Sequence, residues 1–149
     1  MNITVTLLKT INDKQKLRDE FIQLYQEAGW LDLAGDLDKL DWIDRLLEGS
    51  YCFVAAFHRD RMIGMGRSIS DGVSDAYIQD VTVLKSYRGR GIGSRIMRNI
   101  ISHLKQNGID WIGLIAEPGS GSLYRKLGFS EMTGNIPMLL DGTRWKNLT

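Results

Sequence analysis

Apolar residues in the N-terminal half of the chain follow two different periods. Short apolar or alternating runs predict strands at Thr4–Leu8, Tyr51–Phe57, Met62–Ile69 and Ala76–Val83. Helical spacing predicts a first helix, capped by Asn12 or Asp13, whose apolar side is Leu17, Phe21, Leu24, Tyr25 and Ala28. A second helix is predicted to begin at Asp36 or Asp38 and to end at Gly49, with an apolar side of Leu37, Leu40, Ile43, Leu46 and Leu47.

The C-terminal half opens with a long amphipathic pattern after Gly93. The helix it predicts ends at Asn107-Gly108 and has an apolar row of Ile92, Ile96, Ile100 and Leu104. A strand at Trp111–Ala116 and a short helix at Ser122–Leu127 follow, and the segment Asn135–Leu140 together with Trp145 predicts one or two last strands. Strands before a helix, followed by strand, helix and strand, indicate a mixed sheet with helices packed on it.

Length and composition fit one domain inside a cell. The chain has 149 residues, 43% of them hydrophobic, so we expect a single domain over residues 1–149. The single cysteine, Cys52, excludes a disulfide framework, favours a reducing cytoplasm, and is expected to be a buried strand residue. The N-terminus lacks the features of a secretion signal and no apolar run reaches about 18 residues, so we expect no membrane partner.

The segment between the strand ending near Leu84 and the long helix carries the clearest chemical signal. It reads Tyr87-Arg88-Gly89-Arg90-Gly91-Ile92-Gly93, a glycine-rich turn that opens a helix. Glycines let the backbone approach a ligand closely, and the first helical turn presents unpaired N–H groups with about half a unit of positive charge. We therefore expect this turn to bind a phosphate or a pyrophosphate.

Positive charge is concentrated around the same turn. Residues 81–109 contain no Asp or Glu, and their basic residues are Lys85, Arg88, Arg90, Arg95, Arg98 and Lys105. The whole chain has a formal net charge of only +1, so a protein that coats nucleic acid is not indicated. Ser94-Arg95 follow Gly93 where a P-loop has Lys-Ser/Thr, and the glycine spacing does not fit a dinucleotide-binding fingerprint.

Two ordered motifs resemble signatures of the GNAT (Gcn5-related N-acetyltransferase) superfamily. The acyl-CoA-binding motif of that family, Arg/Gln-x-x-Gly-x-Gly/Ala, is matched here by Arg88, Gly91 and Gly93. The second signature, Tyr-x-Lys-x-Gly-Phe, is matched here by Tyr124, Lys126, Gly128 and Phe129. The resemblance covers residues 76–129 and departs from the family pattern at Lys85, where the family usually has proline.

The resemblance implies a fold and an acyl-donor site. The implied fold is α/β (α+β): a mixed, mostly antiparallel sheet of roughly six to seven strands, about four flanking helices, and two strands splayed at the acyl-CoA site. Those strands correspond to Ile78–Val83 and Trp111–Ala116, with the pantetheine arm of acetyl-CoA between them and a backbone N–H near Val83 facing the acyl oxygen. The implied acetyl-CoA-binding residues are Val81, Val83, Arg88, Gly89, Arg90, Gly91, Ile92, Gly93 and Ser94.

Three residues are candidates for proton transfer. The resemblance implies that Tyr124 protonates the departing CoA thiolate, and helix-to-sheet packing is its alternative role. An alkylammonium with a pKa near about 10 must lose a proton before it attacks, and the best-placed acceptors are Asp80 and Glu117. Each of these carboxylates also suits a structural or solvated role. The only histidines, His58 and His103, are predicted in a turn and on an exposed helix face, so we expect no metal site.

The expected activity is transfer of an acetyl group from acetyl-CoA to a primary amine of a small molecule, by direct attack in a ternary complex. Acetylation of a protein or peptide amine, and acyl-CoA sensing without catalysis, remain alternatives. In this superfamily the N-terminal helices cover the acceptor, where Trp30 and Trp42 suit either an aromatic wall or the core. The acidic residues of that region suit either attraction of a cationic amine or helix capping: Asp32, Asp36, Asp38, Asp41, Asp44 and Glu48. A homodimer is a further expectation.

Overall fold

The structure is a computed structural model that describes residues 1–8, 14–31 and 42–142. The chain divides into two units, Met1–Leu114 and Ile115–Thr149. The described residues form five strands and four α-helices, so the mixed α/β fold class is confirmed while the sheet has fewer strands than the six to seven expected. The single domain over residues 1–149 stays a prediction.

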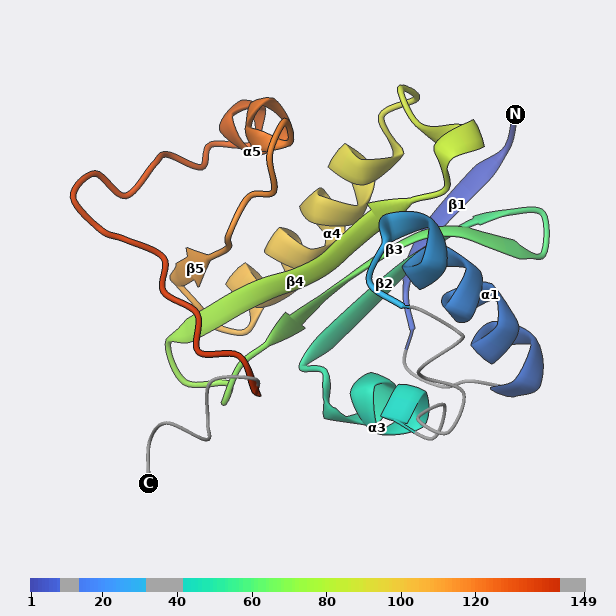
Figure 1. The fold of residues 1–149 in the computed structure, drawn as a ribbon, viewed down its shortest axis with the longest axis horizontal. Coiled ribbons are helices and arrows are strands. Elements are labelled where there is room, and N and C mark those ends of the chain that lie inside the picture. Colours follow the sequence, from blue (N-terminus) through green and yellow to red (C-terminus); the bar gives the residue numbers. More distant parts are fainter. Residues whose placement is uncertain (9–13, 32–41, 143–149) are drawn as a thin grey trace. The chain divides into compact units, whose positions relative to one another are not determined.

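The first unit is built on one sheet with the strand order β1-β2-β3-β4-β5 (Figure 1). The strands are β1 (Ile3–Leu7), β2 (Cys52–His58), β3 (Arg61–Ile69), β4 (Asp75–Val83) and β5 (Trp111–Gly113). The first four strands pair antiparallel with their neighbours, whereas β5 pairs parallel with β4. Parallel neighbours need a crossover connection, and helix α4 (Ile92–Gln106) provides it.

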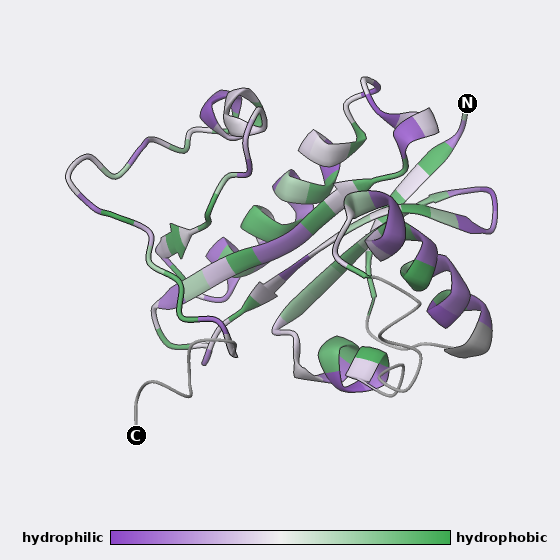
Figure 2. Cartoon of the chain, in the orientation of Figure 1, coloured by the Kyte–Doolittle hydropathy of each residue, from purple (hydrophilic) through white to green (hydrophobic). Residues whose placement is uncertain are grey.

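Helices cover both faces of this sheet. Helix α4 lies on one face, and α1 (Lys14–Ala28) and α3 (Trp42–Gly49) lie on the other (Figure 1). The predicted apolar row of α4 is fully buried, because Ile92, Ile96, Ile100 and Leu104 all point at the strands. Figure 2 shows hydrophobic residues along β2 and hydrophilic residues at the β2–β3 turn, as expected for a central strand and an exposed hairpin end.

Two glycines of β3 let α4 approach the sheet closely. A Cβ atom at Gly66 would lie 2.9 Å from Cγ2 of Ile96, and one at Gly64 would lie 3.1 Å from Cδ1 of the same side chain. Both distances are shorter than ordinary packing contacts, so glycine is required here by space. Because side chains alternate along a strand, Arg67 points to the opposite face, toward α1 and α3.

The second unit contains one helix, α5 (Gly121–Lys126), close to the predicted Ser122–Leu127. The strand predicted at Asn135–Leu140 is wrong, since the structure has no strand there and Ile136, Met138 and Leu139 are 80 to 91% exposed. Pro137 has no N–H to give to a ladder, and an apolar run forms a strand only beside a partner strand. Trp145 lies outside the described residues.

Most predicted boundaries agree with the structure within about two residues. The exception is β5, which ends at Gly113 instead of Ala116 because only Trp111–Gly113 pair with β4. The predicted cap of the first helix at Asn12 or Asp13, and the predicted start of the second at Asp36 or Asp38, lie outside the described residues.

Candidate functional site

The turn between β4 and α4 is shaped by two glycines in the left-handed conformation. Gly89 and Gly91 both have φ of +73°, and a Cβ at either position would meet open space, so backbone conformation requires glycine there. Gly91 is the N-cap of α4 and provides no side-chain cap. The N–H groups of Ile92, Gly93 and Ser94 lie in the first helical turn, where no intrahelical acceptor is available, and so suit an anionic ligand.

This turn is anchored to the rest of the first unit. The guanidinium of Arg88 donates from Nε to the carbonyl oxygen of Val83 at 2.9 Å, which ties the turn to the last residue of β4. A short 3₁₀ helix, Lys85–Tyr87, precedes Arg88, and the backbone N–H of Lys85 donates to Oε2 of Glu27 in α1 at 2.9 Å. Arg88 therefore braces the turn in addition to the role in cofactor binding that the resemblance implies.

The edge of β4 that faces β5 is paired over only part of its length. The pairing with β5 covers Asp75–Tyr77, whereas β4 continues to Val83. On the other edge, the N–H of Leu84 donates to the carbonyl oxygen of Ile63 in β3 at 2.9 Å. Successive backbone N–H groups of a strand point to opposite edges, so the N–H of Val83 points away from β3. Within the described part of the first unit, this edge of β4 has no strand partner beyond Tyr77.

Asp80 lies in a β-bulge in the middle of β4. The register pairs Met65 with Thr82 and Arg67 with Gln79, so Asp80 and Val81 together face the single residue Gly66. Asp80 has φ of +57°, a conformation that aspartate tolerates better than most side chains. The bulge turns the Asp80 side chain toward the face of the sheet that carries α1.

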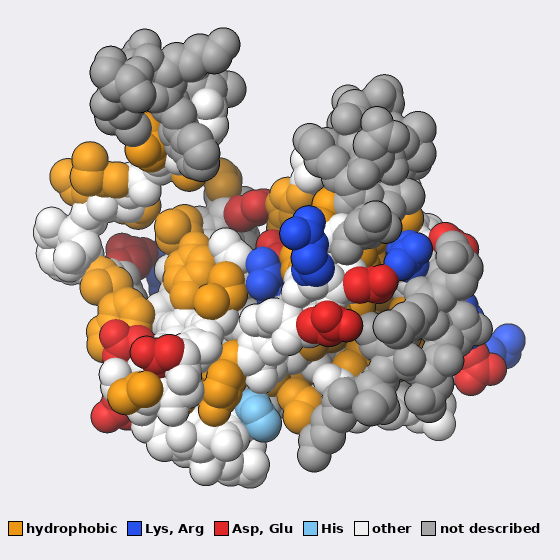
Figure 3. Space-filling model, turned by 90° about the horizontal axis from the view of Figure 1, so that it is seen from below, with side chains coloured by type: hydrophobic (Ala, Val, Ile, Leu, Met, Phe, Trp, Pro, Cys, Tyr) orange, Lys and Arg blue, Asp and Glu red, His pale blue; other side chains and the backbone are white. Residues whose placement is uncertain are grey.

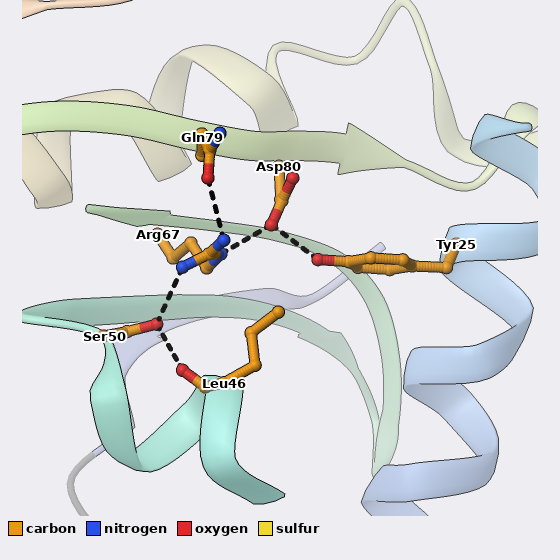
Figure 4. Close-up of polar contacts among 6 residues, drawn as sticks. All are labelled: Tyr25, Leu46, Ser50, Arg67, Gln79 and Asp80. Carbon is orange, nitrogen blue, oxygen red and sulfur yellow. Dashed lines mark hydrogen bonds and ion pairs between the residues drawn. The ribbon is translucent and has the colours of Figure 1, made fainter. Parts of the chain in front are cut away.

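The Asp80 carboxylate is held by two donors on different elements (Figure 4). Arg67 of β3 donates from Nε to Oδ2 at 2.5 Å, and the hydroxyl of Tyr25 in α1 donates to the same oxygen at 2.6 Å. Arg67 also donates from Nη2 to Oε1 of Gln79 at 2.8 Å. The ion pair is largely buried, with 12% of the Arg67 side chain and 21% of the Asp80 side chain exposed. The bulge and its carboxylate are therefore fixed from both β3 and α1.

Aromatic rings hold Tyr25 in place. Its ring stacks on Phe21 at 4.3 Å between centroids, and it also contacts the rings of Trp30 at 5.3 Å and Trp42 at 5.6 Å. Burial and the hydrogen bond to Asp80 raise the pKa of the Tyr25 hydroxyl, so it stays protonated and donates. Trp42 is half-buried, whereas 36% of Trp30 is exposed, so the choice between an aromatic wall and the core stays a prediction for both residues.

Tyr124 and Glu117 lie in the second unit. Tyr124 belongs to α5, and its ring meets that of Phe129 edge-on at 6.1 Å between centroids. Burial and the negative charge of Glu117 raise the pKa of the Tyr124 hydroxyl, which is thus protonated at neutral pH. A protonated, half-buried hydroxyl is suited to donate a proton to a leaving group.

Other polar candidates have structural partners. Asp44 of the acidic region forms an ion pair with Arg18 at 2.7 Å, while Asp32, Asp36, Asp38 and Asp41 lie outside the described residues. On the face in Figure 3, basic and acidic side chains lie close to one another. His58 lies with Nδ1 3.0 Å from the hydroxyl of Tyr87, and Cys52 is buried, as predicted. Within residues 1–8, 14–31 and 42–142, no cluster suits a metal ion and no helix is long and apolar enough to cross a membrane.

A comparison with protein families covers the segments described above. The model of a family described as the Acetyltransferase (GNAT) family matches residues 15–129, which include the glycine turn, the bulge and Tyr124. The chain belongs to this family.

Individual GNAT proteins agree with this assignment. An uncharacterized N-acetyltransferase, ycf52, from Porphyra purpurea is 31% identical over 134 residues, which cover 83% of this chain and 77% of that protein. The structure of a probable acetyltransferase from Staphylococcus aureus is 28% identical, with a TM-score of 0.77 and coverage of 94% of this chain and 99% of the other. A GNAT family protein from Streptococcus pneumoniae TIGR4 is 26% identical, with a TM-score of 0.76 and coverage of 95% and 98%. The resemblance found in the sequence is confirmed.

Two residues that contact Asp80, namely Arg67 and Tyr25, were not singled out from the sequence. Arg67 had a signal in the sequence, because it lies two residues after Met65, which is fully buried on the same side of β3. A charge on a buried strand face needs a partner, and the facing strand offers Asp80. Tyr25 was placed correctly on the apolar side of its helix, but its hydroxyl partner depends on tertiary packing.

Proposed function

We propose that this GNAT protein transfers an acetyl group from acetyl-CoA to a primary amine of a small molecule, by direct attack in a ternary complex. The observation that carries the proposal is the turn at Gly89 and Gly91, which leaves the N-terminus of α4 without a side-chain cap. Backbone donors and the helix dipole at such an end suit the pyrophosphate of CoA. The unpaired edge of β4 next to it suits the pantetheine arm, which adds as an extended segment.

The residues of β4 suit the acyl-transfer step. The amine nitrogen attacks the thioester carbonyl carbon, a C–N bond forms, and negative charge develops on the carbonyl oxygen. The N–H of Val83 points to the open edge and is our candidate donor to that oxygen. As the C–N bond forms, the nitrogen becomes positively charged and loses a proton readily, so a carboxylate such as Asp80 is a sufficient acceptor. Glu117 is the second candidate for this role.

Tyr124 is our candidate acid for the last step. When the C–S bond breaks, the CoA sulfur leaves as a thiolate and takes a proton. The hydroxyl of Tyr124 is available to supply it, because burial and Glu117 raise its pKa. A positioned general acid contributes about 10²- to 10⁴-fold to the rate, and Tyr124→Phe is expected to lower kcat by that factor while leaving CoA affinity nearly unchanged.

A small acceptor suits the position of Asp80. Only 21% of its side chain is exposed, so the carboxylate is recessed between β4 and α1. A small amine reaches a recessed carboxylate more readily than an amine on the surface of a folded protein.

The experiment is thiol release from acetyl-CoA with a panel of polyamines, aminoglycosides, amino acids, arylamines and short peptides, together with calorimetric binding of CoA. Tyr51→Phe is the matched control, because Tyr51 packs against His103 and has no part in the proposed chemistry. Amine-dependent release that Tyr124→Phe loses and Tyr51→Phe keeps supports the proposal. CoA binding without release from any amine favours an acyl-CoA sensor, release only with peptides favours a peptide acceptor, and absence of CoA binding contradicts the proposal.

A further inference from the structure

Arg67 occupies an unusual place for a cation. It lies on the face of β3 that carries the fully buried Met65, and only 12% of its own side chain is exposed. Its guanidinium donates there to three side chains, namely Asp80 and Gln79 of β4 and Ser50, which precedes β2 (Figure 4). A buried charge is costly unless it is paired, so the position of Arg67 is tied to that of Asp80.

Both donors to Asp80 use the same carboxylate oxygen. Nε of Arg67 and the hydroxyl of Tyr25 reach Oδ2 from different sides, at 2.5 and 2.6 Å. Among the described residues, none donates a hydrogen bond to Oδ1, and Figure 4 shows that oxygen directed away from both donors. One oxygen of the carboxylate is thus fixed while the other stays available.

We propose that Arg67 and Tyr25 are positioning residues of the acetyl transfer: by holding Oδ2 of Asp80, they present Oδ1 to the acceptor amine. This inference rests on the proposed function, in which Asp80 takes the proton of that amine. Neither Arg67 nor Tyr25 touches the substrate. They act through Asp80, whose side chain projects from a bulge and needs external contacts to keep one orientation.

The arrangement also explains why the two donors come from separate elements. Arg67 lies on the neighbouring strand, so its contact sets the position of Asp80 relative to the sheet. Tyr25 lies on α1, where Phe21, Trp30 and Trp42 surround its ring, so its contact sets the position of Asp80 relative to the helix. A carboxylate that is held by both elements keeps its orientation toward the acceptor amine.

The test is a pair of double-mutant cycles measured with the amine that shows turnover. Asp80→Asn keeps an oxygen of similar geometry but cannot take the proton, and Asn tolerates the left-handed backbone of the bulge. Arg67→Gln and Tyr25→Phe each remove one donor. We expect Arg67→Gln to lower kcat about 10²-fold, as misplacement of a reacting group does, and Tyr25→Phe to lower it about 10-fold.

Three readouts separate positioning from a structural role. We expect the KM for acetyl-CoA to stay unchanged in both variants, since the glycine turn is not altered. In the Asp80→Asn background, neither second change is expected to lower kcat further, because residues that act through one group are not additive. Arg18→Gln is the matched control: it removes another partly buried ion pair, Arg18–Asp44 at 2.7 Å, and is expected to keep the wild-type kcat.

Several outcomes contradict the inference. Additive losses of kcat in the Asp80→Asn background, or wild-type kcat in both Arg67→Gln and Tyr25→Phe, would overturn the positioning role while leaving acetyl transfer intact. Wild-type kcat in Asp80→Asn would remove Asp80 from the mechanism and overturn the role as well. If the unaltered protein transfers acetyl to no amine in the panel, the proposed function itself fails, and this inference fails with it.

Discussion

Replacing Gly91 by alanine perturbs the proposed phosphate cradle at its centre. Gly91 caps α4 with φ of +73°, a conformation that costs an L-residue about 1–2 kcal/mol. To relieve this strain, the backbone at the N-terminus of α4 has to shift. The N–H groups of the first helical turn then no longer point at a bound pyrophosphate. A hydrogen bond to a charged group contributes about 1.5–3 kcal/mol, so losing one lowers CoA affinity by roughly 10- to 100-fold.

The assay compares two ligands and two glycines. Calorimetry measures binding of CoA and of pantetheine, which lacks the pyrophosphate, so Gly91→Ala is expected to weaken CoA and to leave pantetheine unchanged. Gly108 is the matched control, because it follows the other end of α4 with φ of +79° and its Cβ would also meet open space. Gly108→Ala therefore strains the same helix without touching the cradle.

Two results would refute this reasoning. If Gly91→Ala and Gly108→Ala weaken CoA binding equally, the effect comes from the stability of α4 and not from its N-terminal donors. If Gly91→Ala binds CoA as the unaltered protein does, the pyrophosphate does not rest on this turn.

Two further predictions concern buried groups with raised pKa values. Burial raises the pKa of the Cys52 thiol to about 11. We therefore expect iodoacetamide to leave Cys52 unmodified in the folded protein at pH 8 and to alkylate it rapidly in urea, as measured by mass spectrometry. Modification of the folded protein would contradict the buried position of β2. Burial and Asp80 raise the pKa of Tyr25, so the folded state keeps this proton above pH 10 while the unfolded state loses it, and stability falls as pH rises. Urea unfolding at pH 9 and pH 11 measures the effect. Between these pH values we expect the free energy of unfolding to fall by about 1 kcal/mol more in the unaltered protein than in Tyr25→Phe, which has no phenolic proton at this position. Equal decreases in both proteins would mean that Tyr25 is not held in a buried, protonated state.

The sequence was sufficient for those parts of the fold that depend on local pattern. The apolar row of α4 has one clear period, and the glycines before it specify a turn that few other residues allow, so the helix and its N-terminus were predicted nearly residue by residue. The strands β2, β3 and β4 were predicted from their short apolar or alternating runs, which are also local patterns. The segment Asn135–Leu140 failed because strand formation depends on a partner, and apolar content alone does not reveal one.

In the candidate site, too, local pattern predicts some residues and not others. The residues of the glycine turn form a contiguous motif and could be read directly. Asp80 was selected from its place on a strand, but neither its bulge nor its pairing with Arg67 and Tyr25 follows from local pattern. These contacts join β3, β4 and α1, so they appear only when the sheet register and the helix position are known.

The central claim, acetyl transfer to an amine, is tested most directly by measuring acetylated product and free CoA in the same reaction. The account predicts that an acetylated amine, identified by mass spectrometry, accumulates in equal amount to the CoA released, and that Tyr124→Phe slows both together. Binding of acetyl-CoA with no acetylated product from any amine, and CoA release no faster than spontaneous hydrolysis, would contradict it.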